Sequence, residues 1–164
     1  MSLDRIAVVG ISGSGKTTFA RKLAARTGLP LFHGDQLEWQ MNWITRPAAE
    51  IEALQRSWIE QPHWIIEGWI DVDRIERLKI ADVVVDLDYA SALCTWRVFL
   101  RMLRGNRRSE MPAGCVDKFN WRFLKNIFWK MERPAIEGAL GASRMKKYVR
   151  LPSPRAAQAW LDSL

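Results

Sequence analysis

The sequence predicts an α/β fold in which a parallel β-sheet lies between two layers of helices. Two observations lead to this expectation. Short apolar runs, typical of buried strands, alternate with longer stretches whose apolar residues recur at helical spacing. A glycine-rich loop, Gly10–Thr17, joins the first strand-like run to the first helix-like stretch. Because strands that alternate with helices pair in parallel, we expect a three-layer fold with five parallel strands and helices on both faces.

The first strand, expected at 5–9, leads into a loop that fits G-x-x-x-x-G-K-[ST] at every required position. Glycines let successive N–H groups point inward, and the next helix N-terminus adds unpaired donors and positive charge. Lys16 is expected to reach the β- and γ-phosphates of a nucleotide, and Thr17 to place its hydroxyl on Mg²⁺. A glycine-rich turn that arises by chance is the alternative, which the flanking strand and helix disfavour. The expected nucleotide-binding residues are Gly10, Ser12, Gly13, Ser14, Gly15, Lys16, Thr17 and Thr18.

Polar residues follow the second strand, which we expect at 31–32. Ligands of open parallel sheets bind beyond the carboxyl ends of the strands. Asp35 therefore either orients an acceptor and takes its proton, or it caps a helix or turn. The neighbouring His33 is typical of a structural residue.

Tryptophans are frequent after Asp35, and Trp39, Trp43 and Trp58 either stack on a ring of a ligand or belong to the core. A helix is expected over 47–61. The third strand, expected at 64–67, brings Glu67 to the edge where ligands bind. We expect the acceptor to lie among Trp39, Trp43, Glu67 and Trp69.

The fourth strand is expected at 81–87, because its centre is continuously apolar. Asp86 and Asp88 end it, and we expect one of them to stand behind Mg²⁺ through a water molecule. Asp88 alternatively caps the helix that follows.

That helix, expected at 91–103, carries arginines at helical spacing, and two more arginines follow it. The set is Arg97, Arg101, Arg104, Arg107 and Arg108. Like charges at this spacing repel one another, and arginine forks suit phosphate oxygens, so we expect a triphosphate to compensate them. We therefore expect a short arginine-rich lid at 97–116 that closes on the γ-phosphate. The apolar residues of the helix share another side: Leu93, Trp96, Leu100 and Leu103.

The last part of the chain is expected to form a helix at 117–132, a fifth strand at 147–151 and a closing helix at 155–161. Short helical stretches are expected at 71–79 and 134–140. The helix at 117–132 carries an apolar stripe of Trp121, Leu124, Phe128 and Met131. It also carries a basic stripe of Lys118, Arg122 and Lys125.

Length and charge limit the classes of function. The 164 residues suit a single domain over 1–164, and the net charge is +7. The segment 97–155 holds 15 basic and 4 acidic residues, hence +11, so it either binds a polyanion or forms a solvated surface. No apolar run approaches the roughly 20 residues of a membrane span. With the first strand at the N-terminus and no secretory signal, we expect a cytoplasmic protein that does not enter membranes.

Several pieces of the sequence resemble the nucleoside monophosphate kinases, a group of P-loop proteins that includes adenylate and shikimate kinases. More closely, the chain resembles the small bacterial DNA topology modulation or adenylate kinase-related proteins. The matching pieces are Gly10–Thr17, His33-Gly34-Asp35 with Leu37, Trp39 and Asn42-Trp43, Trp64 to Gly68, Pro112 to Cys115, Phe123 to Lys125, and Arg133-Pro134. The resemblance implies the P-loop NTPase fold with strand order 2-3-1-4-5, and ATP with Mg²⁺ as ligands. Trp69 and the stretch 108–111 depart from the usual pattern, on the acceptor and lid side.

These observations predict a kinase-like enzyme that transfers the γ-phosphoryl group of Mg-ATP to a small acceptor, including a nucleotide. The expected catalytic residues are Lys16, Asp35, Arg97, Arg101, Arg104 and Arg108. The alternative is a nucleotide-gated regulator that binds DNA or affects its topology through the basic C-terminal half. A third reading is an ATPase whose lid admits water. The sequence identifies neither the acceptor nor the oligomeric state.

Overall fold

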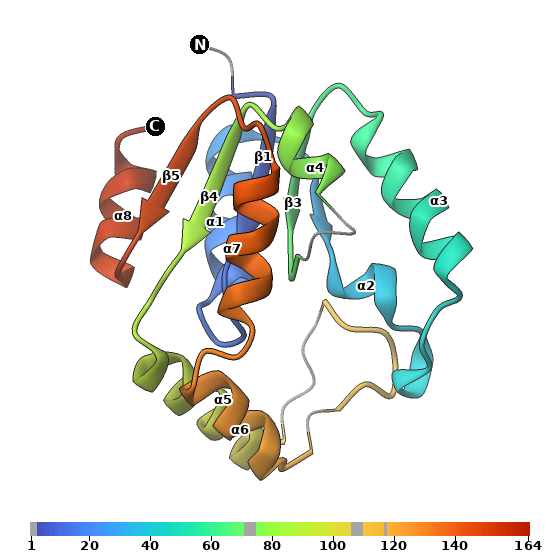
Figure 1. Ribbon diagram of the computed structural model, residues 1–164, viewed down its shortest axis with the longest axis vertical. Coiled ribbons are helices and arrows are strands. Elements are labelled where there is room, and N and C mark those ends of the chain that lie inside the picture. Colours follow the sequence, from blue (N-terminus) through green and yellow to red (C-terminus); the bar gives the residue numbers. More distant parts are fainter. Residues whose placement is uncertain (1–2, 71–74, 106–109, 117) are drawn as a thin grey trace.

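Five parallel strands form one sheet at the centre of the protein (Figure 1). The computed structural model describes residues 3–70, 75–105, 110–116 and 118–164. The strands are β1 (Arg5–Val9), β2 (Leu31–His33), β3 (Trp64–Glu67), β4 (Val83–Leu87) and β5 (Tyr148–Leu151). Their order is β2-β3-β1-β4-β5, which confirms the expected order and the parallel direction of all strands.

The three middle strands form the core because their sequences are almost continuously apolar. Ile6 of β1 lies opposite Ile65 of β3 on one side and Val83 of β4 on the other, and all three are buried. Parallel strands covered on both faces need such apolar runs. The edge strands β2 and β5 are partly exposed, in keeping with their shorter apolar runs.

Helices cover both faces of the sheet. Figure 1 shows α1 (Lys16–Thr27) behind it and α4 (Glu76–Ile80) and α7 (Arg133–Ala142) in front. The last helix, α8 (Pro154–Asp162), packs on α1, where the Phe19 and Trp160 ring centroids are 5.8 Å apart. The helix α3 (Ala48–Ile59) stacks Trp58 on Phe32 of the edge strand β2. Within the described residues, no helix is both long and apolar enough to span a membrane.

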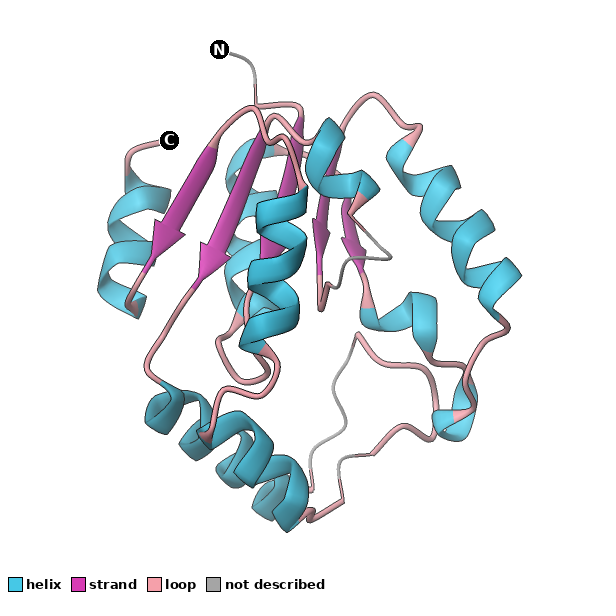
Figure 2. Ribbon diagram, viewed as in Figure 1, coloured by secondary structure: helices cyan, strands magenta, loops and turns pink. Residues whose placement is uncertain are grey.

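The carboxyl ends of all five strands point toward the remaining elements (Figure 2). These are α2 (Asp35–Glu38), the short segment Met41–Trp43, α5 (Ser91–Arg104) and α6 (Trp121–Phe128). Because β1 ends in the glycine loop, this arrangement brings α5 and α2 around the N-terminus of α1.

The expectation of one helix over 117–132 is wrong. The Asn120 side chain accepts a hydrogen bond from the Phe123 amide and starts α6, which ends at Phe128. Lys130 then takes a positive φ of 51°, which ends helical geometry and turns the chain into α7. Asp117 lies outside the described residues, as do residues 71–74 of the short helix expected at 71–79.

The helix α5 buries a different stripe from the one marked by its largest apolar residues. Cys94, Val98 and Met102 face the core, whereas Trp96 and Leu103 are exposed. The phosphate loop approaches this side of α5 closely, because a Cβ on Gly13 would lie 2.3 Å from the Cys94 carbonyl oxygen.

Candidate active site

The glycine loop between β1 and α1 has a backbone that only glycine adopts easily. Gly10, Gly13 and Gly15 have φ values of 148°, 80° and 88°. A Cβ on Gly10 would lie 2.8 Å from the Leu87 carbonyl oxygen, so neighbouring backbone also excludes a side chain there. The loop ends at the N-terminus of α1, where unpaired N–H groups and the helix dipole favour an anion.

The side chains of the loop fit a polyphosphate. The Lys16 ammonium donates to the carbonyl oxygens of Gly10 at 2.8 Å and Ile11 at 3.0 Å, so it lies across the loop. The Ser14 hydroxyl is fully buried and has no hydrogen-bond partner among the described residues. A cleft opens beside the loop, and Thr18 is among the residues that line it. A buried polar atom without a partner is costly unless a ligand satisfies it, and phosphate oxygens would accept from these donors.

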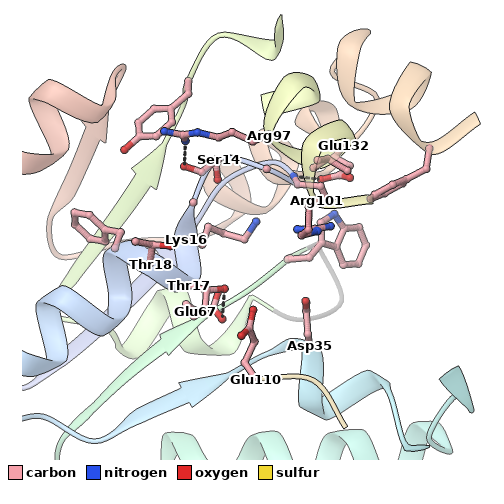
Figure 3. Close-up of a pocket in the computed structure, with 18 of the residues that line it drawn as sticks. Ser14, Lys16, Thr17, Thr18, Asp35, Glu67, Arg97, Arg101, Glu110 and Glu132 are labelled. Carbon is pink, nitrogen blue, oxygen red and sulfur yellow. Dashed lines mark hydrogen bonds between the residues drawn. The ribbon is translucent and has the colours of Figure 1, made fainter. Parts of the chain in front are cut away.

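A carboxylate from β3 meets Thr17 at the start of α1. The Thr17 hydroxyl donates to Glu67 Oε1 at 3.2 Å (Figure 3). His33 Nδ1 lies 2.8 Å from the same oxygen. Glu67 is almost fully buried. Mg²⁺ in nucleotide sites takes oxygen ligands, from one or two protein groups and from phosphates. The Thr17 hydroxyl with Glu67 beside it fits such an ion.

The expected place of Asp86 or Asp88 behind Mg²⁺ is corrected by their contacts. Asp86 is fully buried and binds Arg133 at 2.8 Å and the Tyr148 hydroxyl at 2.8 Å. Asp88 pairs with Lys130 at 3.2 Å and with Arg150. Neither carboxylate lines the cleft that contains the phosphate loop. Buried charges need partners, and here basic residues from the α6–α7 corner and from β5 supply them.

The pKa values of this cluster follow from its contacts. Burial raises the pKa of the Asp88 carboxyl, but hydrogen bonds from Arg150 and Lys130 and the charge of Arg133 outweigh it and leave the pKa below its ordinary value. Burial, with the hydrogen bond to Asp86, raises the pKa of Tyr148 to about 12. Paired charges in this cluster therefore link the end of β4 to β5 and to the residues around the start of α7.

An acidic side chain that is distant in sequence touches the phosphate loop. Glu132 Oε2 accepts a hydrogen bond of 2.7 Å from the Ser12 amide, across 120 positions of sequence. Glu132 lies in the turn before α7 and lines the cleft. No local pattern marks this residue, because only the packing of α7 on the sheet brings it to the loop.

Two of the expected arginines approach the phosphate loop. Arg97 donates to the Ser14 carbonyl oxygen at 3.3 Å and lies 5.7 Å from the centre of the Tyr89 ring. Arg101, one turn further along α5, lines the same cleft (Figure 3). Arg104 is exposed and does not line the cleft. Arg107 and Arg108 lie outside the described residues.

The acceptor side of the cleft is formed by α2 and the segments around it. Figure 3 shows Asp35 and Glu110 pointing into the space beside Thr17 and Glu67. The expected Trp39, Trp43 and Trp69 also line the cleft, whose volume is about 1230 Å³. The turns after β2 and β3 hold Asp35 in place, because the Gly34 amide donates to the Glu67 carbonyl oxygen at 2.6 Å.

Comparison with known proteins identifies the fold. No protein-family model matches the chain, and no curated protein matches it in sequence. A shikimate kinase from Acinetobacter baumannii, solved with shikimate, superposes with a TM-score of 0.61 and 19% identity over 99% of this chain and 90% of that one. A sugar kinase from Janibacter sp. HTCC2649 superposes with a TM-score of 0.59 and 17% identity, over 98% of this chain and 94% of that one. For a gluconokinase from Sinorhizobium meliloti 1021 the TM-score is 0.58 and the identity 17%, over 98% of this chain and 93% of the gluconokinase.

The chain has the fold of the P-loop kinases. At these identities the likeness concerns the fold alone, and it spans nearly the whole of each chain. The strand order and the position of the glycine loop after β1 agree with it.

Proposed function

We propose that this protein is a Mg²⁺-dependent kinase that transfers the γ-phosphoryl group of ATP to a hydroxyl of a small molecule. The observation that carries the proposal is one cleft lined by the phosphate loop, by Arg97 and Arg101, and by Asp35. Donors for a triphosphate and a carboxylate for an acceptor thus share one space. The kinases of the same fold that act on sugars, shikimate and gluconate support this reading.

The nucleotide side supplies charge and position. Phosphoryl transfer needs little covalent help from a protein, because its barrier falls when the reactants are aligned and the developing charge is neutralised. The loop amides and Lys16 would hold the β- and γ-phosphates. Arg97 and Arg101 would neutralise charge on the γ-phosphoryl oxygens from the side of α5.

Magnesium has a natural place in this arrangement. When bound, Mg²⁺ neutralises the phosphate oxygens and orients the γ-phosphoryl group. Thr17 would hold it through its hydroxyl, and Glu67 through a water molecule, with His33 fixing the orientation of the Glu67 carboxylate.

Asp35 would orient the acceptor. In the proposed step the acceptor hydroxyl oxygen forms a bond to the γ-phosphorus, and the bond from that phosphorus to the bridging oxygen breaks, leaving ADP. The hydroxyl proton passes to the Asp35 carboxylate and then to solvent. The products are ADP and a phosphate monoester.

The deciding experiment measures ADP formation from Mg-ATP with a panel of acceptors. The panel holds sugars and cyclitols, small hydroxy acids, nucleosides, and the nucleoside monophosphates that the sequence resemblance suggests. Lys16→Ala is expected to abolish acceptor-dependent turnover while its unfolding curve stays that of the wild type. Undiminished turnover in Lys16→Ala would overturn the proposal.

One surface feature of α6 supports the alternative function, which is binding of nucleic acid. On α6 the exposed Trp121 ring lies 5.9 Å from the Lys125 ammonium, and Arg122 is exposed nearby. Exposed aromatic and basic side chains together suit single strands. The test is retention of single- and double-stranded DNA by the wild type and by Trp121→Ala, with and without ATP. Retention that ignores nucleotide, persists in Trp121→Ala and vanishes at modest salt would reduce this role to general polycation behaviour.

A further inference from the structure

The backbone of the segment Met41–Trp43 is strained. Asn42 and Trp43 have φ values of 60° and 61°, so two successive residues with side chains lie in the left-handed region. Asparagine tolerates this region, but for a bulky aromatic residue such as Trp43 the conformation is a strained outlier. The surrounding structure must therefore hold this segment, and strain of this kind is concentrated at ligand sites.

The chain segment 113–116 holds it. The Asn42 amide donates to the Ala113 carbonyl oxygen at 3.0 Å, and the Trp43 amide donates to Cys115 Sγ at 3.3 Å. The Trp43 indole N–H donates to the Val116 carbonyl oxygen at 3.2 Å. Both the backbone and the ring of Trp43 are thereby fixed by residues some 70 positions away in sequence.

Gly114 makes this close approach possible. A Cβ at this position would lie 1.8 Å from Asn42 Oδ1 and 3.2 Å from the Asn42 amide nitrogen. Gly114 also has a positive φ of 79°, which other residues adopt only with strain. The contact between the two segments thus depends on a residue without a side chain at this one point.

The result is an aromatic wall in the cleft. Trp43 meets Trp39 edge to face, with the ring centroids 5.3 Å apart, and both rings line the cleft. Asp35 and Glu38, the first and last residues of α2, line the same cleft. The wall therefore stands beside carboxylates on the side of the cleft that we propose for the acceptor.

We propose that the acceptor is a ring-bearing alcohol, such as a sugar or a cyclitol, whose ring packs on Trp39 and Trp43. This inference rests on the proposed kinase function and adds the class of its acceptor. An indole face offers a large rigid surface to a ring at a small entropic cost. A carboxylate group can accept about four hydrogen bonds, so it can bind a substrate hydroxyl in addition to its partners within the protein. Asp35 and Glu38 therefore suit a substrate that carries many hydroxyl groups.

The same contacts make Trp43 a specificity-determining residue. Its position depends on contacts with 113–116. Because Gly114 allows this close approach, acceptor affinity should depend on Gly114 although this residue lies outside the cleft lining.

The test compares myo-inositol and glucose with mannitol, an open-chain alcohol that has as many hydroxyls as inositol. Acceptor KM and kcat are measured with saturating Mg-ATP for the wild type, Trp43→Ala and Trp43→Phe. Loss of one ring contact should raise the KM of the ring acceptor about tenfold with little change in kcat, and Trp43→Phe should restore most of it. Trp129→Ala, exposed outside the cleft, is the matched control.

Gly114→Ala provides a second variant that leaves both indoles in the chain. It should raise the acceptor KM as Trp43→Ala does, while calorimetry shows wild-type affinity for Mg-ADP. Equal use of mannitol and inositol, or a KM indifferent to Trp43→Ala, would overturn the inference while the kinase function stands.

Binding separates the two proposals. Inositol and glucose are titrated calorimetrically into the protein loaded with a non-hydrolysable ATP analogue. Binding that Trp43→Ala abolishes, without any turnover in the wild type, would support the ring-binding site and overturn the kinase function. Absence of both binding and turnover with every ring alcohol would overturn the inference.

Discussion

The carboxyl ends of β3 and β4 each carry buried acidic residues, yet the two ends are built for different tasks. At the end of β3, Glu67 meets the Thr17 hydroxyl and the His33 imidazole beside the phosphate loop. At the end of β4, Asp86 and Asp88 meet Arg133, Lys130 and Arg150. The partners of a carboxylate at the ligand edge of a sheet therefore decide its task. A carboxylate paired with guanidinium and ammonium groups joins elements, whereas one beside a hydroxyl at a phosphate loop suits a cation.

The largest expected effect is a loss of folding stability when the charged cluster at the end of β4 is broken. Asp86→Asn would remove the fully buried anion of the Arg133 guanidinium, which is only 11% exposed, and leave it the exposed Glu137 and the more distant Asp88. Breaking a buried pair in this way costs about 3–5 kcal/mol of unfolding free energy. Urea unfolding followed by tryptophan fluorescence measures it, with Asp162→Asn, from an exposed pair with Arg26, as the control expected to change little. If the urea midpoint of Asp86→Asn equals that of the wild type, the charged cluster does not stabilise the contact between β4 and α7.

The next effect sharpens the comparison at β3. Glu67→Gln keeps the shape and a hydrogen-bonding oxygen but removes the charge beside Thr17. We expect about a 10–100-fold loss of apparent Mg²⁺ affinity, as for other groups that orient a metal ligand, with an unfolding midpoint near that of the wild type. Mn²⁺ binding in the presence of ADP, followed by electron paramagnetic resonance, measures it. Unchanged metal binding would remove Glu67 from the magnesium site.

A smaller, pH-dependent effect is expected for Asp88. Its pKa is lower in the folded protein than in the unfolded chain, so its charged form adds stability above the ordinary carboxyl pKa and loses it as the pH falls through the lowered value. Asp88→Asn should therefore be less stable than the wild type at pH 7, and the gap should close on acidification below about pH 4. Urea midpoints across this range measure it; a gap of constant size would contradict the prediction.

The smallest effect concerns Glu132. Its carboxylate occupies the Ser12 amide and places negative charge in a loop that we expect to hold phosphates. Glu132→Gln should raise the affinity for ADP a few-fold by removing that repulsion. Calorimetric titration measures it, and Glu137→Gln, from an exposed residue of α7 that pairs with Arg133, is the matched control. Weaker binding by Glu132→Gln would mean that the carboxylate supports the loop instead of opposing the phosphates.

The sequence alone determined the elements whose signals are local. Gly10–Thr17 is recognisable because each position has its own steric or chemical requirement, and the three middle strands because parallel strands covered on both faces are continuously apolar. These signals predicted the parallel sheet and the direction in which its ligand edge faces, whereas the strand order was implied by the family resemblance. The helical spacing of Arg97 and Arg101 predicted that they share a side of α5, and both line the cleft.

Only the tertiary structure decided which side chains meet. Glu67 was expected at the ligand edge but on the acceptor side, and its bond to Thr17 spans 50 positions. Asp86 and Asp88 were expected near magnesium, yet the end of α6 at Phe128 and the turn at Lys130 bring basic residues onto them. Helical spacing states which residues share a side of a helix, whereas packing against distant segments selects the side that is buried and the charges that are paired.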